Sequence, residues 1–420
     1  MGVSCVQSHF LIRRPFVPLG SGLPRVQTFR MTNQCMNAFL KFWIGAWLAA
    51  ISWCVQAQMP EAPEMAVKAY LLMDVTANQV LAAKDPEMAV EPASLTKLMT
   101  AYLVFEALKN RKIDLKQSLP VSERAWKMPG SRMFIDPKMK VPVEDLIKGM
   151  VVQSGNDATV ALAEGVAGSV ERFVVLMNEQ AKALGMKDST FKNPEGLTEP
   201  GHTTTANDLA LLAGRLMSDF PDYMGYYAQK KYRYPGTPAA NENNRNLLLF
   251  RDPSVDGLKT GHTEAAGYCL VATAQRTLPQ VGPRRLLSIV LGASSENARA
   301  AESQKLLNWG YTAFDAVRLF DAGQAVVTPP VWKGRETEVK LGVNRPLVVA
   351  LPAGQLARMT TQVARPDPLV APIVRGQQIG HLQVLVDQKV FAEIPLVALN
   401  GVEPSGILGR AWDAIRLWIK

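Results

Sequence analysis

The order of hydrophobic and polar positions divides the chain into segments of different period. Two apolar runs, VKAYLLMDV and QVLAA, lie between residues 66 and 83 and are separated by Thr76-Ala77-Asn78, which predicts a β-hairpin. Apolar residues then recur at helical spacing in PASLTKLMTAYLVFEAL, residues 92–108, where Pro92 suits a helix start. The same spacing predicts further helices over residues 143–152, 156–167, 170–185 and 206–218.

Strand-like patterns return after these helices. The runs GYCLVATAQ and RRLLSIVLGAS, on either side of the loop from Pro279 to Pro283, predict a second hairpin. The segment AAESQKLLNWGYTAFDAV, residues 300–317, is again periodic like a helix. Strands at both ends of a mostly helical stretch predict an α+β domain, in which helices flank an antiparallel sheet.

The pattern changes once more after about Leu319. Short apolar runs alternate with Gly and Pro at strand length, which predicts a small all-β domain over residues 319–400. Residues 401–420 end in GILGRAWDAIRLWIK, which predicts an amphipathic helix that is too short to span a membrane. Its apolar face would carry Leu408, Trp412, Ile415 and Ile419, and its polar face Arg410, Asp413, Arg416 and Lys420. We expect it to lie on a membrane surface, the alternative being a helix packed on the protein or on a partner.

Residues 1–57 are typical of a leader with a secretory signal. Lys41 precedes the apolar run FWIGAWLAAISWCV, and Val55-Gln56-Ala57 has the small-x-small pattern of a cleavage site. The mature chain would begin at Gln58, although an uncleaved anchor is the alternative. Of the four cysteines only Cys269 would survive cleavage, and its apolar surroundings predict a buried, unpaired thiol.

Composition argues against a dedicated nucleic-acid binder. The chain has 420 residues, which suggests two or three domains, and a net charge of +9. Five of these charges belong to basic residues in the leader, so nine minus five leaves an excess of four. The sequence contains no Lys/Arg run with interleaved aromatic residues, and we expect no nucleic acid as a partner.

Ser94 and Lys97 are the first candidates for chemistry. They are three residues apart, so they share one face of the first helical turn. A serine hydroxyl needs an adjacent base to become a nucleophile. A lysine can be that base only if burial or nearby positive charge lowers its pKa. The pair alone is weak, because the same spacing is common in solvent-exposed helices.

Two further motifs make the pattern specific. Ser154-Gly155-Asn156 lies between two predicted helices, and Lys259-Thr260-Gly261 enters a predicted strand. The ordered set S-x-x-K, S-x-N and K-T-G is shared by penicillin-binding proteins and class A β-lactamases. Each short motif occurs often by chance, whereas the three in this order, on these elements, do not.

The chain resembles the low-molecular-mass penicillin-binding proteins that are serine-type D-alanyl-D-alanine carboxypeptidases. The resemblance covers nearly everything after the signal and extends to whole phrases: EPASLTKLMTAYLVFEAL, VQSGNDA, FKNPEGL, NRN, VDGLKTGHT and AESQKLLNWG. It implies a β-lactamase/transpeptidase-like catalytic domain over residues 58–318. A small β domain (319–400) and a membrane-anchor helix (401–420) would follow.

The resemblance also implies a role for each motif residue. Ser94 would attack the D-Ala-D-Ala carbonyl with Lys97 as its base, Ser154 would relay a proton, and Lys259 would tune the local field. The implied substrate-binding residues are Asn156, Thr260, Gly261, His262 and Arg245. Backbone N–H groups of Ser94 and His262 would form the oxyanion hole.

These roles imply a specific activity and location. The enzyme would remove the terminal D-alanine from peptidoglycan pentapeptides and would be acylated by β-lactam antibiotics. It would need no metal or organic cofactor, and it would lie on the periplasmic side of the inner membrane. Position 195 in NPEGL is glutamate, and the sequence leaves open whether this side chain points into the site. His202 and His381 are interpreted as surface or loop histidines, and Asp256-Gly257 as a turn.

Three alternatives remain. A class A β-lactamase needs a glutamate-activated water, but the segment PEGLTEPGH lacks the corresponding Glu-x-x-Leu-Asn pattern. A murein endopeptidase would cut an internal cross-link, and such relatives usually lack the small β domain expected here. A non-catalytic murein-binding protein would keep the motifs by descent alone.

Overall fold

The computed structural model describes residues 59–279 and 281–419, so the expected signal and its cleavage site lie outside the described residues. The described chain forms two compact units. One contains Glu61–Ala322 and Arg345–Leu356, and the other contains Gly323–Asn344 and Ala357–Lys420. Each unit is described by itself below.

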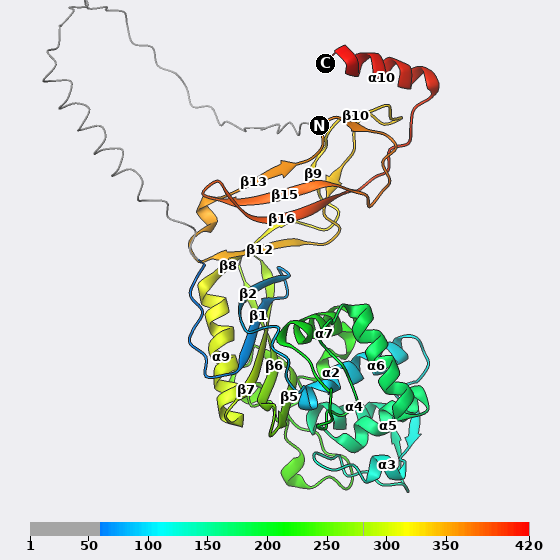
Figure 1. Cartoon of the computed structure of the whole chain (residues 1–420), viewed down its shortest axis with the longest axis vertical. Helices are drawn as coiled ribbons and strands as arrows, with labels where there is room; N and C mark the ends of the chain where they lie inside the picture. Colours follow the sequence, from blue (N-terminus) through cyan, green and yellow to red (C-terminus); the bar gives the residue numbers. More distant parts are fainter. Residues whose placement is uncertain (1–58, 280, 420) are drawn as a thin grey trace, which may run out of the picture. The chain divides into compact units, whose positions relative to one another are not determined.

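The first unit is built on a five-stranded antiparallel sheet with strand order β2-β1-β7-β6-β5. Both predicted hairpins are confirmed as β1/β2 and β6/β7. Helix α9 (Glu296–Ala313) covers one face of this sheet, and the other helices gather on the opposite face (Figure 1). The strands are β1 (Ala69–Asp74), β2 (Gln79–Lys84), β5 (Val255–Thr263), β6 (Gly267–Leu278) and β7 (Gly282–Ala293).

The predicted helices are also present. They are α2 (Lys97–Lys109), α4 (Val143–Val152), α5 (Asn156–Ala167), α6 (Val170–Leu184) and α7 (Ala206–Asp219). Thr205 caps α7 by accepting a hydrogen bond from the Asp208 N–H (3.1 Å). Shorter elements complete the unit: β3 (Ser118–Pro120), α3 (Glu123–Trp126), β4 (Lys140–Pro142), η3 (Pro221–Tyr226), η4 (Ala239–Asn241) and α8 (Leu248–Arg251).

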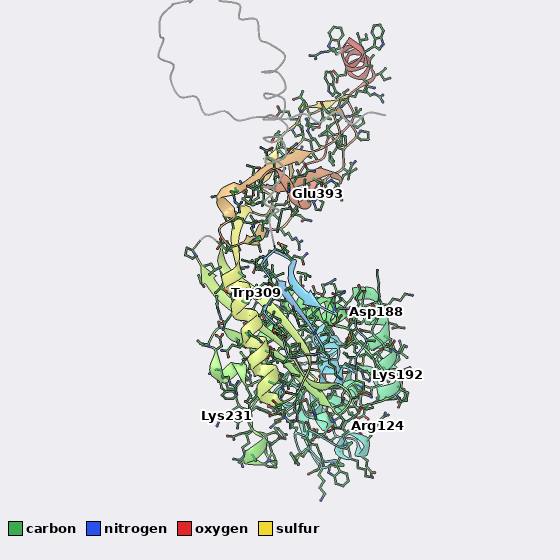
Figure 2. All side chains as sticks on the ribbon, turned by 60° about the vertical axis from the view of Figure 1, so that its left-hand side comes forward. Arg124, Asp188, Lys192, Lys231, Trp309 and Glu393 are labelled. Atoms are coloured by element: carbon green, nitrogen blue, oxygen red, sulfur yellow. The ribbon has the colours of Figure 1, made fainter. Side chains whose placement is uncertain are left out.

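Helix α2 is the centre of the helical layer. All its residues except Glu106 and Lys109 are buried, so it is apolar on every side, as a core helix must be. Each fully buried leucine or phenylalanine contributes about 1.5–3 kcal/mol through loss of apolar surface from water. On the other face of the sheet, Trp309 of α9 packs edge-on against Phe314 at 5.4 Å between ring centroids (Figure 2). The two faces of the sheet thus have separate hydrophobic cores, and the segment that carries Lys97 belongs to the core on the helical side.

The C-terminal end of α9 differs from the prediction. The helix ends at Ala313, and residues Phe314–Phe320 form strand β8, which pairs with β12 (Leu347–Pro352). Arg284 fixes this change of structure, because its guanidinium donates to the Phe314 carbonyl at 2.7 Å. The boundary expected at residues 318/319 thus falls inside β8, and β12, expected in the small β domain, belongs to the first unit.

The interpretation of Asp256-Gly257 as a turn is wrong. Both residues lie within β5. The Asp256 carboxylate accepts two hydrogen bonds of 2.7 Å from the Arg285 guanidinium of β7. This bidentate ion pair lets an aspartate, which is disfavoured in strands, sit in the sheet.

The second unit is mainly β, as predicted. Its larger sheet has strand order β13-β15-β16-β11-β9, and β10 pairs in parallel with β14. The elements are β9 (Ala325–Val327), β10 (Val331–Trp332), β11 (Leu341–Gly342), β13 (Met359–Ala364), β14 (Leu369–Val370), β15 (Gln378–Val386) and β16 (Lys389–Ala398). The 3-10 turn η5 (Leu356–Arg358) precedes β13.

The chain ends in helix α10 (Ile407–Ile419). Trp412 and Trp418 are 63% and 89% exposed. Asp413 accepts a hydrogen bond from the Lys333 N–H at 2.7 Å, which ties the helix to the segment after β10. Among the described residues, no helix has both the length and the hydropathy that a membrane crossing requires.

Candidate active site

Ser94 lies in a tight turn that precedes α2. Residues Ala93–Thr96 form the 3-10 helix η2 and Lys97 is the first residue of α2, so the predicted single helix begins with a tighter turn. Ala93 has a left-handed backbone, with φ of 47°. Such conformations of non-glycine residues concentrate at functional sites. The turn brings Ser94 Oγ to 2.9 Å from Lys97 Nζ.

Lys97 Nζ is surrounded by three oxygen atoms. Besides Ser94 Oγ, it contacts Asn156 Oδ1 at 2.8 Å and the Glu195 carbonyl oxygen at 2.6 Å. Asn156 Nδ2 donates to the Pro129 carbonyl at 2.7 Å, which fixes the orientation of the amide. The amide and carbonyl oxygens can only accept, whereas the Ser94 hydroxyl can also donate. A neutral Lys97 amine therefore gives its two N–H groups to Asn156 and Glu195 and turns its lone pair to Ser94.

The pKa of Lys97 favours this neutral form. All effects together lower the pKa from its ordinary value to about 7; burial is the largest cause, and the nearby Arg245 guanidinium acts in the same direction. The carboxylates of Glu195 and Asp157 act in the opposite direction. A substantial share of the lysine is therefore unprotonated near neutral pH, as a general base requires.

The second serine–lysine pair lies beside the first. Lys259 of β5 has its Nζ 2.9 Å from Ser154 Oγ and 3.0 Å from the Thr260 carbonyl oxygen. Burial lowers the pKa of Lys259 well below its usual value, and the positive charge of Lys97 adds to this effect. Ser154 has a left-handed backbone, with φ of 59°, a conformation that costs a residue other than glycine roughly 1–3 kcal/mol.

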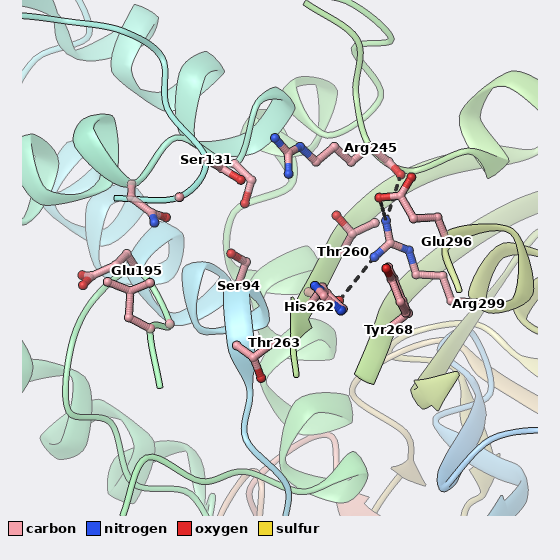
Figure 3. A pocket seen from close by; sticks show the side chains of 16 residues that line it. Ser94, Ser131, Glu195, Arg245, Thr260, His262, Thr263, Tyr268, Glu296 and Arg299 are labelled. Carbon is pink, nitrogen blue, oxygen red and sulfur yellow. Dashed lines mark hydrogen bonds and ion pairs between the residues drawn. The ribbon is translucent and has the colours of Figure 1, made fainter. Parts of the chain in front are cut away.

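These residues surround a cavity of about 250 Å³. Figure 3 shows Ser94 at its centre, with Arg245 and Arg299 on one side and Glu195 on the other. The structure brings all nine residues predicted from the sequence together. Seven of them line the cavity: Ser94, Ser154, Asn156, Arg245, Thr260, Gly261 and His262. The other two, Lys97 and Lys259, contact the hydroxyl groups of Ser94 and Ser154.

The cavity has a cationic end that the sequence only partly predicts. The predicted Arg245 lies there beside Arg299 of α9, which the sequence analysis missed. Arg299 is buried and donates to the Gly261 carbonyl at 3.3 Å and to the Glu296 carboxylate at 3.4 Å. Burial lowers the pKa of both guanidiniums, although each stays charged at neutral pH. This end is suited to a carboxylate group.

Asp157 is a second residue that the analysis missed, although it directly follows the SGN motif. Its buried carboxylate accepts hydrogen bonds from the Met133 and Phe134 N–H groups at 2.8 and 2.7 Å. It thereby holds the loop that contributes Gly130 and Ser131 to the cavity wall. This role depends on a loop more than twenty residues earlier, and no local pattern in the sequence reports such a contact.

The structure also shows where Glu195 and His202 lie. Glu195 lines the cavity. His202 lies in a loop, in agreement with one of the two interpretations, but it is buried, with Nε2 3.0 Å from Thr96 Oγ1, and does not lie on the surface. Burial lowers the pKa of His202 to about 4. The neutral ring also packs edge-on against Phe191 and supports the turn that carries Ser94.

Comparison with known families agrees with this geometry. The family model described as D-alanyl-D-alanine carboxypeptidase matches residues 56–295. A second model, described as the C-terminal domain of penicillin-binding protein 5, matches residues 314–404. Together they cover most of both units.

Individual relatives are similar over most of their length. The D-alanyl-D-alanine carboxypeptidase DacC of Escherichia coli (strain K12) is 40% identical over 86% of this chain and 90% of its own. The crystal structure of penicillin binding protein 5 from Haemophilus influenzae superposes with a TM-score of 0.77 at 36% identity. That match covers 82% of this chain and 99% of that one.

A further solved structure contains a bound antibiotic. Penicillin-binding protein D2 from Listeria monocytogenes in the ampicillin-bound form is 30% identical with a TM-score of 0.54, and covers 60% of this chain and all of that one. The two domain matches, the relatives and the paired serine–lysine geometry agree. This chain belongs to the D-alanyl-D-alanine carboxypeptidase family of low-molecular-mass penicillin-binding proteins.

Proposed function

We propose that this chain releases the terminal D-alanine of peptidoglycan pentapeptides through an acyl-enzyme on Ser94. The observation that carries the proposal is the position of Lys97. Its Nζ lies 2.9 Å from Ser94 Oγ, and its two other neighbours can only accept hydrogen bonds. This arrangement directs a neutral amine to take the proton of the serine hydroxyl.

Acylation then proceeds in one site. Ser94 Oγ attacks the carbonyl carbon of the D-Ala-D-Ala bond while its proton passes to Lys97. Ser154, held 2.9 Å from Lys259, passes its proton to the nitrogen of the leaving D-alanine and regains one from the proton that Lys97 took from Ser94. The N–H groups of Ser94 and His262 are assigned to the developing oxyanion. The positive charge of Lys259 favours the negative charge of the transition state.

The cationic end of the cavity supports cleavage at a chain terminus. Arg245, Arg299 and Thr260 line that end, and a guanidinium binds a carboxylate with paired hydrogen bonds. The free carboxylate of the terminal D-alanine would lie there. On the other side of the scissile bond, Asn156 is assigned to the amide of the residue before it.

Hydrolysis of the ester regenerates Ser94. Lys97 takes a proton from water as the water oxygen adds to the acyl carbon. The bond to Ser94 Oγ then breaks, and Lys97 returns the proton to that oxygen. A β-lactam would acylate the same serine, because its ring amide takes the place of the peptide bond. The ampicillin-bound relative supports this inference.

We also propose that the mature enzyme is exported and lies at the periplasmic surface of the inner membrane through α10. The exposed Trp412 and Trp418, together with Arg410 and Arg416 on the same short helix, suit the headgroup region of a bilayer.

Release of D-alanine tests the proposed activity. The purified protein is given a peptide that ends in Lys-D-Ala-D-Ala, and free D-alanine is measured beside the variant Ser94→Ala. We expect release by the wild type and none above background by the variant. Equal release by both would remove Ser94 as nucleophile. Cleavage of cross-linked muropeptides without D-alanine release would indicate an endopeptidase.

A further inference from the structure

Glu195 has an unusual environment for a carboxylate. It lines the cavity but is only 5% exposed, and its Oε2 is buried without a hydrogen-bond partner. An ionised carboxylate in such a place is costly unless a charge compensates it. The mechanism above uses only the backbone carbonyl of this residue and leaves the side chain without a role.

The loop that carries Glu195 is fixed against the start of α2. The Pro194 carbonyl accepts from Thr100 Oγ1 at 2.6 Å, and the Glu195 carbonyl accepts from Lys97 Nζ at 2.6 Å. Asn193 Oδ1 accepts from the Gly196 N–H at 2.7 Å. The carboxyl group of Glu195 belongs to the same residue as the backbone carbonyl that Lys97 contacts. Its short side chain therefore cannot move far from the lysine.

Charged groups of several elements face this pair. Burial raises the pKa of Glu195, and the charge of Lys97 is the strongest effect that opposes this rise. Arg124 of α3 opposes it more weakly, whereas Glu199 of the same loop adds to it. Around Lys97, Arg245 opposes protonation, whereas Asp157 of α5 and Glu195 favour it. Lys259 also lies close enough to interact with Lys97. Glu195 exerts the strongest of the charge effects on the lysine.

We propose that Glu195 is a positioning residue for the reaction, whose carboxylate acts through Lys97 to set the pH at which Ser94 becomes a nucleophile. This inference rests on the proposed function. A negative charge beside Lys97 stabilises its ammonium form, so it holds the lysine close to neutrality instead of allowing burial to deprotonate it completely. The base can then also return a proton when the acyl-enzyme breaks down.

The variant Glu195→Gln separates charge from shape. Glutamine keeps the size of the side chain and removes only its charge. The expected result is that the acidic limb of the pH profile of kcat/KM moves to lower pH by about one unit. At a pH on that limb, kcat/KM expressed as a fraction of its plateau value should then be up to about tenfold higher in the variant than in the wild type.

The control is Glu199→Gln in the same loop, on the full chain purified in detergent. Glu199 accepts a hydrogen bond from Asn193 Nδ2 at 3.2 Å and does not line the cavity. The acidic limb of the pH profile of kcat/KM should therefore stay unchanged in this variant. The second-order rate of labelling by a fluorescent penicillin is measured over the same pH range. It reports the activation of Ser94 without peptide turnover.

The outcomes distinguish the two proposals. A shift to lower pH in Glu195→Gln alone supports the inference. A lower plateau with an unmoved limb, or a limb moved to higher pH, overturns it and leaves the carboxypeptidase intact. Failure of the wild type itself to release D-alanine would instead overturn the proposed function.

Discussion

Lys97 shows how opposing effects on one side chain are resolved. Burial disfavours the ammonium form, the charge of Arg245 disfavours it further, and the carboxylates of Glu195 and Asp157 favour it. Burial is the largest of these, so the pKa falls to about 7 instead of staying near 10.5. A lysine in this range can accept a proton and release it again at neutral pH, which a permanently charged lysine cannot do.

The first prediction is the pH dependence of acylation. Because Lys97 must be neutral to take the Ser94 proton, the second-order rate of penicillin labelling should rise with pH and level off above about 7. Below that pH it should fall about tenfold per unit, since each unit removes nine tenths of the neutral amine. A rate that is flat between pH 5 and 8, or one that falls as pH rises, would contradict Lys97 as the base.

The sequence predicts the site residues that belong to recurring motifs and misses those that lie outside the motifs and reach the site only through the fold. Ser94, Lys97, Ser154 and Lys259 were predicted because their order and elements form a known set. Arg299 lies in an ordinary helix and reaches the cavity only because α9 crosses the sheet. His202 was interpreted as a surface or loop residue, and its burial was missed because burial in an irregular loop has no periodic signature.

Among the elements, the loop of residues 193–197 has the strictest steric requirement. Gly196 has φ of 88°, and a Cβ atom added there would lie 1.8 Å from the Ala93 carbonyl oxygen. Only glycine permits the backbone to pass this close to the turn that carries Ser94. The close approach also lets the neighbouring Glu195 carbonyl reach Lys97.

Gly196→Ala should therefore displace the loop and the Ser94 turn together. We expect D-alanine release to fall at least a hundredfold, and the free energy of unfolding to fall by about 2–4 kcal/mol in chemical denaturation. The matched control is Gly185→Ala, which also has a positive φ of 84° but no atom within 4 Å of the added Cβ. It should lose about 1 kcal/mol and keep its activity. Equal losses of activity in both would show that close packing at Gly196 is not what matters.

Secondary structure was predictable where the pattern is local. The hairpins and the long helices follow from period and from turn residues such as Gly185. The β8 strand was missed because its partner, β12, comes from a segment about thirty residues later. The placement of Asp256 within β5 depends on Arg285 in another strand. In these cases a distant partner overrides local preference.

At the level of the whole chain, the proposed chemistry and the proposed membrane attachment belong to different parts. All residues of the proposed chemistry lie in the first unit. The described contacts of α10 with the rest of its unit are few: Asp413 accepts from the Lys333 N–H, and the Arg416 guanidinium lies over Trp332. Its removal therefore exposes little of the folded protein.

A chain truncated after Gly406, immediately before α10, should separate location from activity, because it keeps the buried Val402 and its pairing with Ile373. We expect it to remain in the supernatant after centrifugation with membranes, while its kcat/KM for D-alanine release stays within about twofold of the full chain. The full chain, centrifuged in parallel, should pellet. A truncated protein that still pelleted would show that α10 is not the anchor.

The covalent bond to Ser94 can be observed directly. The protein is treated with benzylpenicillin, its intact mass is measured, and the digest is searched for the tryptic peptide of residues 85–97, in which Ser94 is the one serine. We predict a gain of one penicilloyl group, located on that peptide and absent from Ser94→Ala. An adduct on another peptide, or an adduct of equal yield in the variant, would contradict the assignment of Ser94 as the nucleophile.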